Sequence, residues 1–192
     1  RKNYDLHNIT GFYVLLIAFI FAVTGLIWGF QWFAFSYYKV LGGEKSLVYV
    51  EPISKIEKEP KNAPASPLDI IWGKMKIEHP KAESIELHPP ENDNSSIAVN
   101  INSDKETYSK IDYRYFDQYS LKEIKVNHIW GRKKDAKLAD TLTKMNYDIH
   151  TGGIFGLAGK VFAFLISLLI ASLPVTGTLI WWGKNKKKKV KN

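Results

Sequence analysis

Two long stretches of this chain contain no charged side chain, namely residues 6–38 and 161–183. The hydrocarbon core of a bilayer is about 30 Å thick, and a helix needs about 20 apolar residues to cross it. Both stretches are long enough, so we expect two transmembrane helices. The first is too long for a signal peptide and the second lies near the C-terminus, so neither is expected to be a cleaved leader. The chain begins at Arg1, and we expect further sequence upstream.

The net charge of +8 is concentrated beside these two stretches. Residues 39–148 hold 18 basic and 18 acidic side chains, whereas residues 184–192 hold six lysines and no acid. Basic residues next to a span mark the cytoplasmic side, where they also meet anionic lipid. We therefore expect both termini inside the cell and residues 39–148 outside. The expected partner of the basic residues is the lipid bilayer and not nucleic acid.

Several classes of chemistry are excluded by the sequence. The chain has no cysteine, which rules out disulfides, thiolate metal sites and cysteine catalysis. It also has no nucleophile elbow, no HExxH and no phosphate-binding loop. Hydrolytic catalysis is therefore unsupported, and whether the protein is an enzyme stays open.

The segment between the two spans has the patterns of a small folded domain. Ser66 and Pro67 predict the start of a helix that stops before His79-Pro80. Alternation of apolar and polar residues then predicts strands over residues 84–88, 97–101, 108–116 and 121–126, before a further helix over 135–145. A helix followed by antiparallel strands is an α+β arrangement.

The expected fold is a membrane protein with two antiparallel transmembrane α-helices that flank a small extramembrane α+β domain. The parts in chain order are an N-terminal transmembrane helix (1–38), a linker (39–67), the α+β domain (68–148), a second transmembrane helix (149–183) and a basic cytoplasmic tail (184–192).

A pentapeptide at the start of the chain recurs before the second span. Asn-Tyr-Asp-Leu-His at residues 3–7 returns as Asn-Tyr-Asp-Ile-His at 146–150. Neutral imidazole is the commonest metal ligand in proteins, and its second nitrogen usually donates to a carboxylate or a carbonyl. We interpret His7 and His150 as metal ligands at opposite membrane faces, with haem as the expected cofactor. The alternative is that both are amphipathic interface residues.

Other residues near the histidines have two interpretations each. The aspartates two positions before the histidines orient the imidazoles or cap helices, with Asp5 or Asn8 as the cap of the first span. Gly152 and Gly153 leave room for a porphyrin beside His150. Lys160 neutralises haem propionates or extends to the membrane interface.

The first span also contains a pair of glycines at helical spacing, Gly25 and Gly29. Such a pair permits the close approach of another helix or of a flat ligand, and helix packing is the simpler interpretation.

These motifs resemble the PepSY-associated transmembrane family. The resemblance rests on Asp-Leu-His-Asn (5–8), Val-Thr-Gly-Leu-Ile-Trp (23–28), Ile-His-Thr-Gly-Gly-Ile-Phe-Gly-Leu-Ala-Gly-Lys (149–160) and Val-Thr-Gly-x-x-x-Trp-Trp (175–182). The middle segment is similar to a PepSY domain. The resemblance implies a bacterial inner-membrane protein whose PepSY-like domain is periplasmic.

Some members of this family are ferric-siderophore reductases with two b haems in a four-helix bundle, and His7 and His150 fall on the family's motif histidines. Such members usually have more than two spans. A complete haem site would therefore need missing helices, a second copy of the chain or other membrane subunits. Transmembrane electron transfer linked to iron or siderophore reduction is one expected function. The alternative is a non-enzymatic accessory or regulatory subunit of a larger membrane complex, with the PepSY-like domain as a periplasmic binding module.

Overall fold

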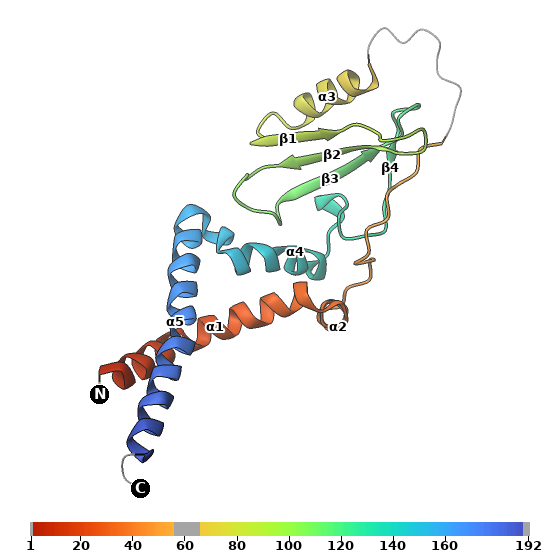
Figure 1. Ribbon diagram of the computed structural model, residues 1–192. Coiled ribbons are helices and arrows are strands. Elements are labelled where there is room, and N and C mark those ends of the chain that lie inside the picture. The colour runs from red at the N-terminus through yellow and green to blue at the C-terminus, as the bar shows by residue number, and fades with distance from the viewer. Residues whose placement is uncertain (1, 56–65, 190–192) are drawn as a thin grey trace. The chain divides into compact units, whose positions relative to one another are not determined.

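The computed structural model describes residues 2–55 and 66–189, which form two compact units. We call Arg1–Ala34 with Asn146–Asn192 the helical unit and Phe35–Met145 the sheet unit. The elements in chain order are α1 (Lys2–Gly29), α2 (Gln31–Val40), α3 (Pro67–Glu78), β1 (Ser84–His88), β2 (Ile97–Asn102), β3 (Ile111–Phe116), β4 (Glu123–Ile124), η1 (Lys133–Asp135), α4 (Leu138–Thr151), η2 (Gly153–Phe155) and α5 (Gly156–Lys189) (Figure 1).

The helical unit is built on α1 and α5, which are 28 and 34 residues long. At a rise of 1.5 Å per residue each helix is longer than about 40 Å, which exceeds the thickness of a bilayer core. Side-chain contacts join the start of α1 to the end of α5 and the end of α1 to the residues just before α5. The two helices are therefore antiparallel, as expected.

The first helix differs from its expected limits. Because α1 already begins at Lys2, Asp5 and Asn8 lie inside the helix, and the expectation that either one caps it is wrong. The helical assignment also breaks at Phe30, so the expected continuous helix to Tyr38 consists of α1 and most of α2.

Most apolar side chains of α1 and α5 are exposed in this chain. They include Phe12, Leu16, Phe164 and Trp182. Exposed apolar surface of this extent requires lipid or further protein around it.

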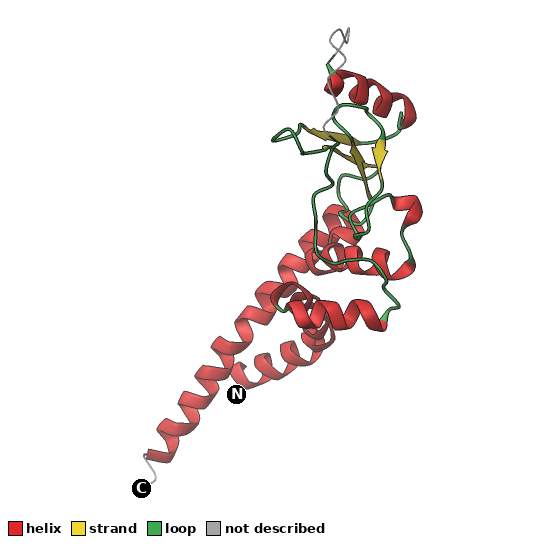
Figure 2. Ribbon diagram, turned by 90° about the vertical axis from the view of Figure 1, so that its right-hand side faces the viewer, coloured by secondary structure: helices red, strands yellow, loops and turns green. Residues whose placement is uncertain are grey.

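The sheet unit contains a four-stranded antiparallel sheet with the strand order β1-β2-β3-β4. Its strands are coloured yellow in Figure 2. Helix α3 covers one face, where Ile71 and Met75 pack on Ile97, Val99 and Phe116. Ile97 and Val99 alternate along β2 with Ala98 and Asn100, so Ala98 and Asn100 lie on the opposite face. The expected α+β arrangement is confirmed.

Local signals predicted α3 and β1 well. The side chain of Ser66 accepts a hydrogen bond from the backbone N–H of Leu68, and the helix ends at Glu78 before His79-Pro80. Strand β1 has its expected limits, whereas β3 begins at Ile111 and β4 contains only two residues. The expected start at Tyr108 is wrong because Tyr108 lies in the turn before β3, where its carbonyl accepts a hydrogen bond from the N–H of Ile111.

A buried polar network joins α2 to the start of α4 within the sheet unit. The hydroxyl of Tyr38 donates to Asp140 over 2.5 Å, and Lys45 Nζ lies 2.9 Å from the other carboxylate oxygen. Tyr38 is fully buried, and a side chain at Gly43 would collide with its ring. Glycine is therefore required at that position.

Candidate functional site

The two histidines of the repeated pentapeptide make reciprocal contacts across the helical unit. His7 Nδ1 lies 2.8 Å from the hydroxyl oxygen of Thr176 on α5. His150 Nδ1 lies 2.8 Å from the hydroxyl oxygen of Thr24 on α1. Each histidine thus contacts the threonine of the Val-Thr-Gly motif that belongs to the other repeat. The two contacts are equivalent, because the first repeat provides the histidine in one and the threonine in the other.

The surroundings of the threonine hydroxyls favour one tautomer of each neutral imidazole. Thr24 Oγ1 lies 2.8 Å from the carbonyl oxygen of Ile20, and Thr176 Oγ1 lies 3.1 Å from that of Ser172. A hydroxyl has one proton, and when it donates that proton to the carbonyl of its own helix its oxygen accepts from the histidine. Nδ1 of each ring is then protonated, and the lone pair is on Nε2, the nitrogen available to a metal.

A glycine lies beside each imidazole. A Cβ atom at Gly25 would lie 3.4 Å from Cε1 of His150, and one at Gly177 would lie 3.4 Å from Cε1 of His7. Larger side chains at either position would displace the ring. Gly29, by contrast, has open space around it, so the two glycines of the first span have different surroundings.

The two histidines lie too far apart to share one metal ion. His7 and the partner of His150, Thr24, are separated by 17 residues of one helix, which corresponds to about 25 Å. Among the residues that the structure describes, no three His, Cys, Asp or Glu side chains come together as a metal site. Each imidazole therefore offers a single protein ligand at its own end of the helix pair.

The glycines after His150 have a packing role of their own. Gly152 has φ +77° and ends the helical run of α4, and a Cβ there would collide with the carbonyl group of Gly159. Gly153 is buried at the start of η2. This turn brings the chain from α4 into α5. Lys160 is half-buried in the second turn of α5.

The aspartates of the repeats do not hold the Nδ1 atoms of the histidines, which instead contact threonine. Asp5 is exposed in the first turn of α1, and Asp148 is buried near the end of α4. Neither is an N-cap. The missed residues are therefore Thr24 and Thr176, and their signal in the sequence is the repeated Val-Thr-Gly.

Further contacts support the position of His150. The side-chain amide of Asn146 donates to the carbonyl oxygen of Thr24 over 3.1 Å, and both residues are buried. The ring of Phe21 lies 5.8 Å from the imidazole, and Trp28 packs edge-on to Tyr147. The second copy of the pentapeptide is thus held against α1 at three of its five positions.

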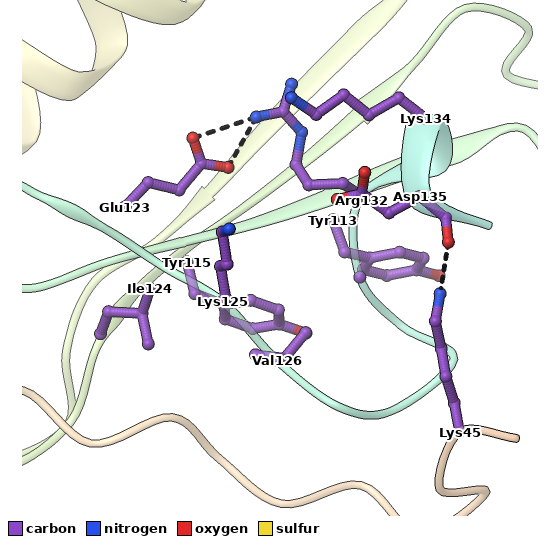
Figure 3. Close-up of a pocket in the computed structure, with 11 residues that line it drawn as sticks. Lys45, Tyr113, Tyr115, Glu123, Ile124, Lys125, Val126, Arg132, Lys134 and Asp135 are labelled. Carbon is purple, nitrogen blue, oxygen red and sulfur yellow. Dashed lines mark hydrogen bonds and ion pairs between the residues drawn. The ribbon is translucent and has the colours of Figure 1, made fainter.

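The sheet unit has a basic cavity of about 200 Å³ beside β3 and β4 (Figure 3). Arg132 donates to both carboxylate oxygens of Glu123, and Lys45 donates to the carbonyl of Asp135. Burial opposes ionisation of Glu123, but hydrogen bonds from Arg114 and Arg132 lower its pKa below the usual value. Two of the cavity's basic side chains thus already have partners within the protein.

Comparison with known proteins supports the membrane assignment. None of the curated proteins compared with this chain matches it. The sequence model described as the PepSY-associated TM region matches residues 1–184, a range that includes both long apolar helices. The expected membrane protein, with a small sheet-containing region between two spans, is thereby confirmed, and the chain belongs to the PepSY-associated TM family.

Proposed function

We propose that this protein binds b-type haem through His7 and His150 and carries electrons across the bacterial inner membrane, linked to iron or siderophore reduction. The observation that carries the proposal is the pair of reciprocal histidine–threonine hydrogen bonds. In the tautomer that these contacts favour, Nδ1 of each neutral ring carries the proton and Nε2 has the lone pair, at opposite ends of the helix pair.

The surroundings of His7 and His150 fit histidines that would hold haem iron. Metal-binding histidines almost always donate their other ring N–H to a neighbouring group, which sets the tautomer and the ring orientation. Thr24 and Thr176 supply this second contact here. Gly25 and Gly177 keep one edge of each imidazole free of a side chain. Haem, when bound, would supply one-electron redox chemistry, while the apolar spans keep water away from the ligands.

One histidine at each end would supply only one protein ligand to a haem iron there. The second ligand at each end would come from helices outside this segment, in a second copy or in another membrane subunit. The exposed apolar faces of α1 and α5 provide the surface on which such helices would pack. We propose Lys160 as the partner of a haem propionate at the end that contains His150, and Gly152 and Gly153 as the backbone beside the porphyrin there.

The proposed orientation places both termini in the cytoplasm and the sheet unit in the periplasm. It follows from the six lysines of residues 184–192, at the C-terminal end of α5 and beyond it, and from Arg1 and Lys2 at the start of the chain.

Absorbance of the protein extracted from membranes in a non-ionic detergent tests the haem proposal. We expect a Soret band that shifts on reduction, and we expect His7→Ala and His150→Ala each to lose about half of the bound haem. His88→Ala is the matched control, because His88 is an exposed residue of the sheet unit. A protein without a Soret band, or one whose band survives both substitutions, would refute the proposal.

An accessory or regulatory role is the second candidate, with the sheet unit as a periplasmic binding module. The observation that favours it is a groove of about 450 Å³ on the sheet face opposite α3. Co-purification with larger membrane subunits in a fixed ratio, without haem, would support this function and contradict the first.

A further inference from the structure

The groove on the open face of the sheet is lined by aromatic side chains. Its floor is formed by Tyr113 and Tyr115 of β3, which pair with Asn100 and Ala98 of β2. Tyr49 and Trp130 stand at its side, with ring centroids 6.1 Å apart and a nearly perpendicular arrangement. The volume of about 450 Å³ lies in the range of small-ligand sites.

The groove also has an acidic rim. Glu51 and Glu91 line it and are exposed, and no Lys or Arg is among the described residues that form its walls. The basic cavity, which Tyr113 and Tyr115 also line, contains Lys45, Lys125, Arg132 and Lys134 instead. Glu123 and Asp135 also line this cavity, so it has four basic and two acidic side chains, whereas the groove has acidic side chains and no Lys or Arg.

The aromatic rings around the groove are largely free of competing cations. His128 packs against Tyr49, Tyr115 and Trp130 at centroid distances of 5.1, 5.8 and 5.9 Å. Burial lowers the pKa of this histidine, which favours its neutral form. Lys144 Nζ lies 5.7 Å from the Tyr113 centroid, so this one ring already has a cationic neighbour.

We propose that this groove binds an organic cation, with an alkylammonium or guanidinium group against Tyr49, Tyr115 and Trp130 and with Glu51 and Glu91 balancing its charge. The face of an aromatic ring attracts a cation because its π-electrons form a region of negative potential. The negative charges of the acidic rim also attract a cationic ligand over a longer distance. The inference specifies a ligand for the sheet unit and does not depend on haem binding by the spans.

Matched charged and neutral probes test the proposal on the full chain in a non-ionic detergent. The first pair is choline and its uncharged isostere 3,3-dimethyl-1-butanol, and the second is acetyl-Gly-Arg-Gly-amide and the same peptide with citrulline. We expect calorimetry to show saturable binding of the charged member of at least one pair and none of its neutral counterpart. Binding of choline alone identifies a small cation as the ligand, and binding of the arginine peptide alone identifies a basic side chain.

Variants show whether the probe occupies this groove. Tyr49→Leu should raise Kd of the bound probe about threefold, whereas Tyr49→Phe, which keeps the ring, should leave it unchanged. Glu51→Gln combined with Glu91→Gln should raise Kd about fivefold at low salt, as expected for two charges near the ligand. Asp69→Asn is the control, because Asp69 is exposed on α3, which covers the other face of the sheet.

Two results would overturn the proposal. One is equal binding of charged and neutral probes, or no binding of any probe. The other is an unchanged Kd in both Tyr49→Leu and the double glutamate variant. Near-ultraviolet circular dichroism of each variant confirms that the sheet unit is folded, and the Soret absorbance of the same samples reports separately on the haem proposal.

Discussion

His150 and Thr24 lie on different helices and 126 residues apart in sequence, yet their Nδ1 and Oγ1 atoms are 2.8 Å apart. The same contact recurs between His7 and Thr176. A histidine–threonine contact therefore exists at each end of α1, to α5 at one end and to the last turn of α4 at the other, and both ends use the same residue types. The first predictions concern this pair of contacts.

Removal of either threonine hydroxyl should weaken the helix pair and change the imidazole. Thr24→Val and Thr176→Val should each destabilise the pair by about 1 kcal/mol, the usual range for a hydrogen bond between membrane helices. Unfolding in mixed micelles measures this loss. The ¹⁵N spectrum of the facing histidine should also lose its preference for a protonated Nδ1, because Nδ1–H no longer has its acceptor. Thr178→Val is the control, since Thr178 is exposed and donates to the Pro174 carbonyl within α5.

The glycine beside each imidazole should tolerate no large side chain. Gly25→Leu places new atoms where Cε1 of His150 now lies, and overpacking of this kind costs about 1–3 kcal/mol. Gly29→Leu provides the comparison, because no atom lies within 4 Å of a Cβ at that position. Equal stability of the two variants in the same unfolding assay would show that the ring is not held against α1.

The sequence contained the parts of this site but not their pairing. The repeated pentapeptide identified His7 and His150, and Val-Thr-Gly was visible in both spans. The spacing from histidine to the threonine of its own repeat is 17 residues in the first copy and 26 in the second. The second copy is longer because it contains the turn at Gly152 between α4 and α5. In the first copy, the histidine and the threonine lie on one uninterrupted helix, α1. Such a turn determines which residues of one helix face which residues of the other. The histidine–threonine pairing therefore could not be derived from either repeat alone.

Within the sheet unit, prediction succeeded where a local residue determines the structure. Ser66 and Pro67 start α3, and the alternation of β1 and β2 is set by burial of one face. The strand expected over residues 121–126 contains only β4, and Leu121 has φ +55°, outside the strand region. The groove combines Tyr49 with Trp130 from distant loops, so no local pattern indicated it.

Arg114 should be the most costly charged residue to remove from the sheet unit. Its side chain is only 4% exposed, and it forms ion pairs with Glu78 and Glu123. Arg114→Ala leaves two carboxylates without their buried partner, and the expected loss is about 3–5 kcal/mol. Arg132, which also pairs with Glu123, is 24% exposed. Arg132→Ala should cost no more than about 1 kcal/mol in thermal or urea unfolding. A similar cost for both variants would contradict the burial of Arg114.

Asp140 should make the stability of the sheet unit depend on acid pH. Burial alone would raise its pKa, but hydrogen bonds from Tyr38 and Lys45 lower the pKa below its usual value. The folded pKa is then lower than the unfolded value of about 3.9, so this stabilisation is complete well above pH 4 and is lost as the pH falls through the folded pKa.

Thermal unfolding between pH 3 and 7 measures this effect. Asp140→Asn should lower stability by about 3 kcal/mol at pH 7 and should flatten the decline below pH 4. Asp69→Asn, at an exposed site on α3, should retain the full decline. If Asp140→Asn loses stability below pH 4 as steeply as the original protein, other carboxyl groups are responsible for the decline.

The absence of cysteine from the sequence makes the proposed orientation directly testable. Asn94→Cys places one thiol on an exposed turn of the sheet unit, and Lys186→Cys places one at the end of α5. A maleimide that cannot cross membranes should label Asn94→Cys in intact spheroplasts, and Lys186→Cys only after permeabilisation, because the lysine-rich end is expected in the cytoplasm. The reverse pattern would invert the orientation and move the groove to the cytoplasmic side. Labelling of both thiols from the same side would be incompatible with an α5 that crosses the bilayer, since that helix lies between the two positions in the chain.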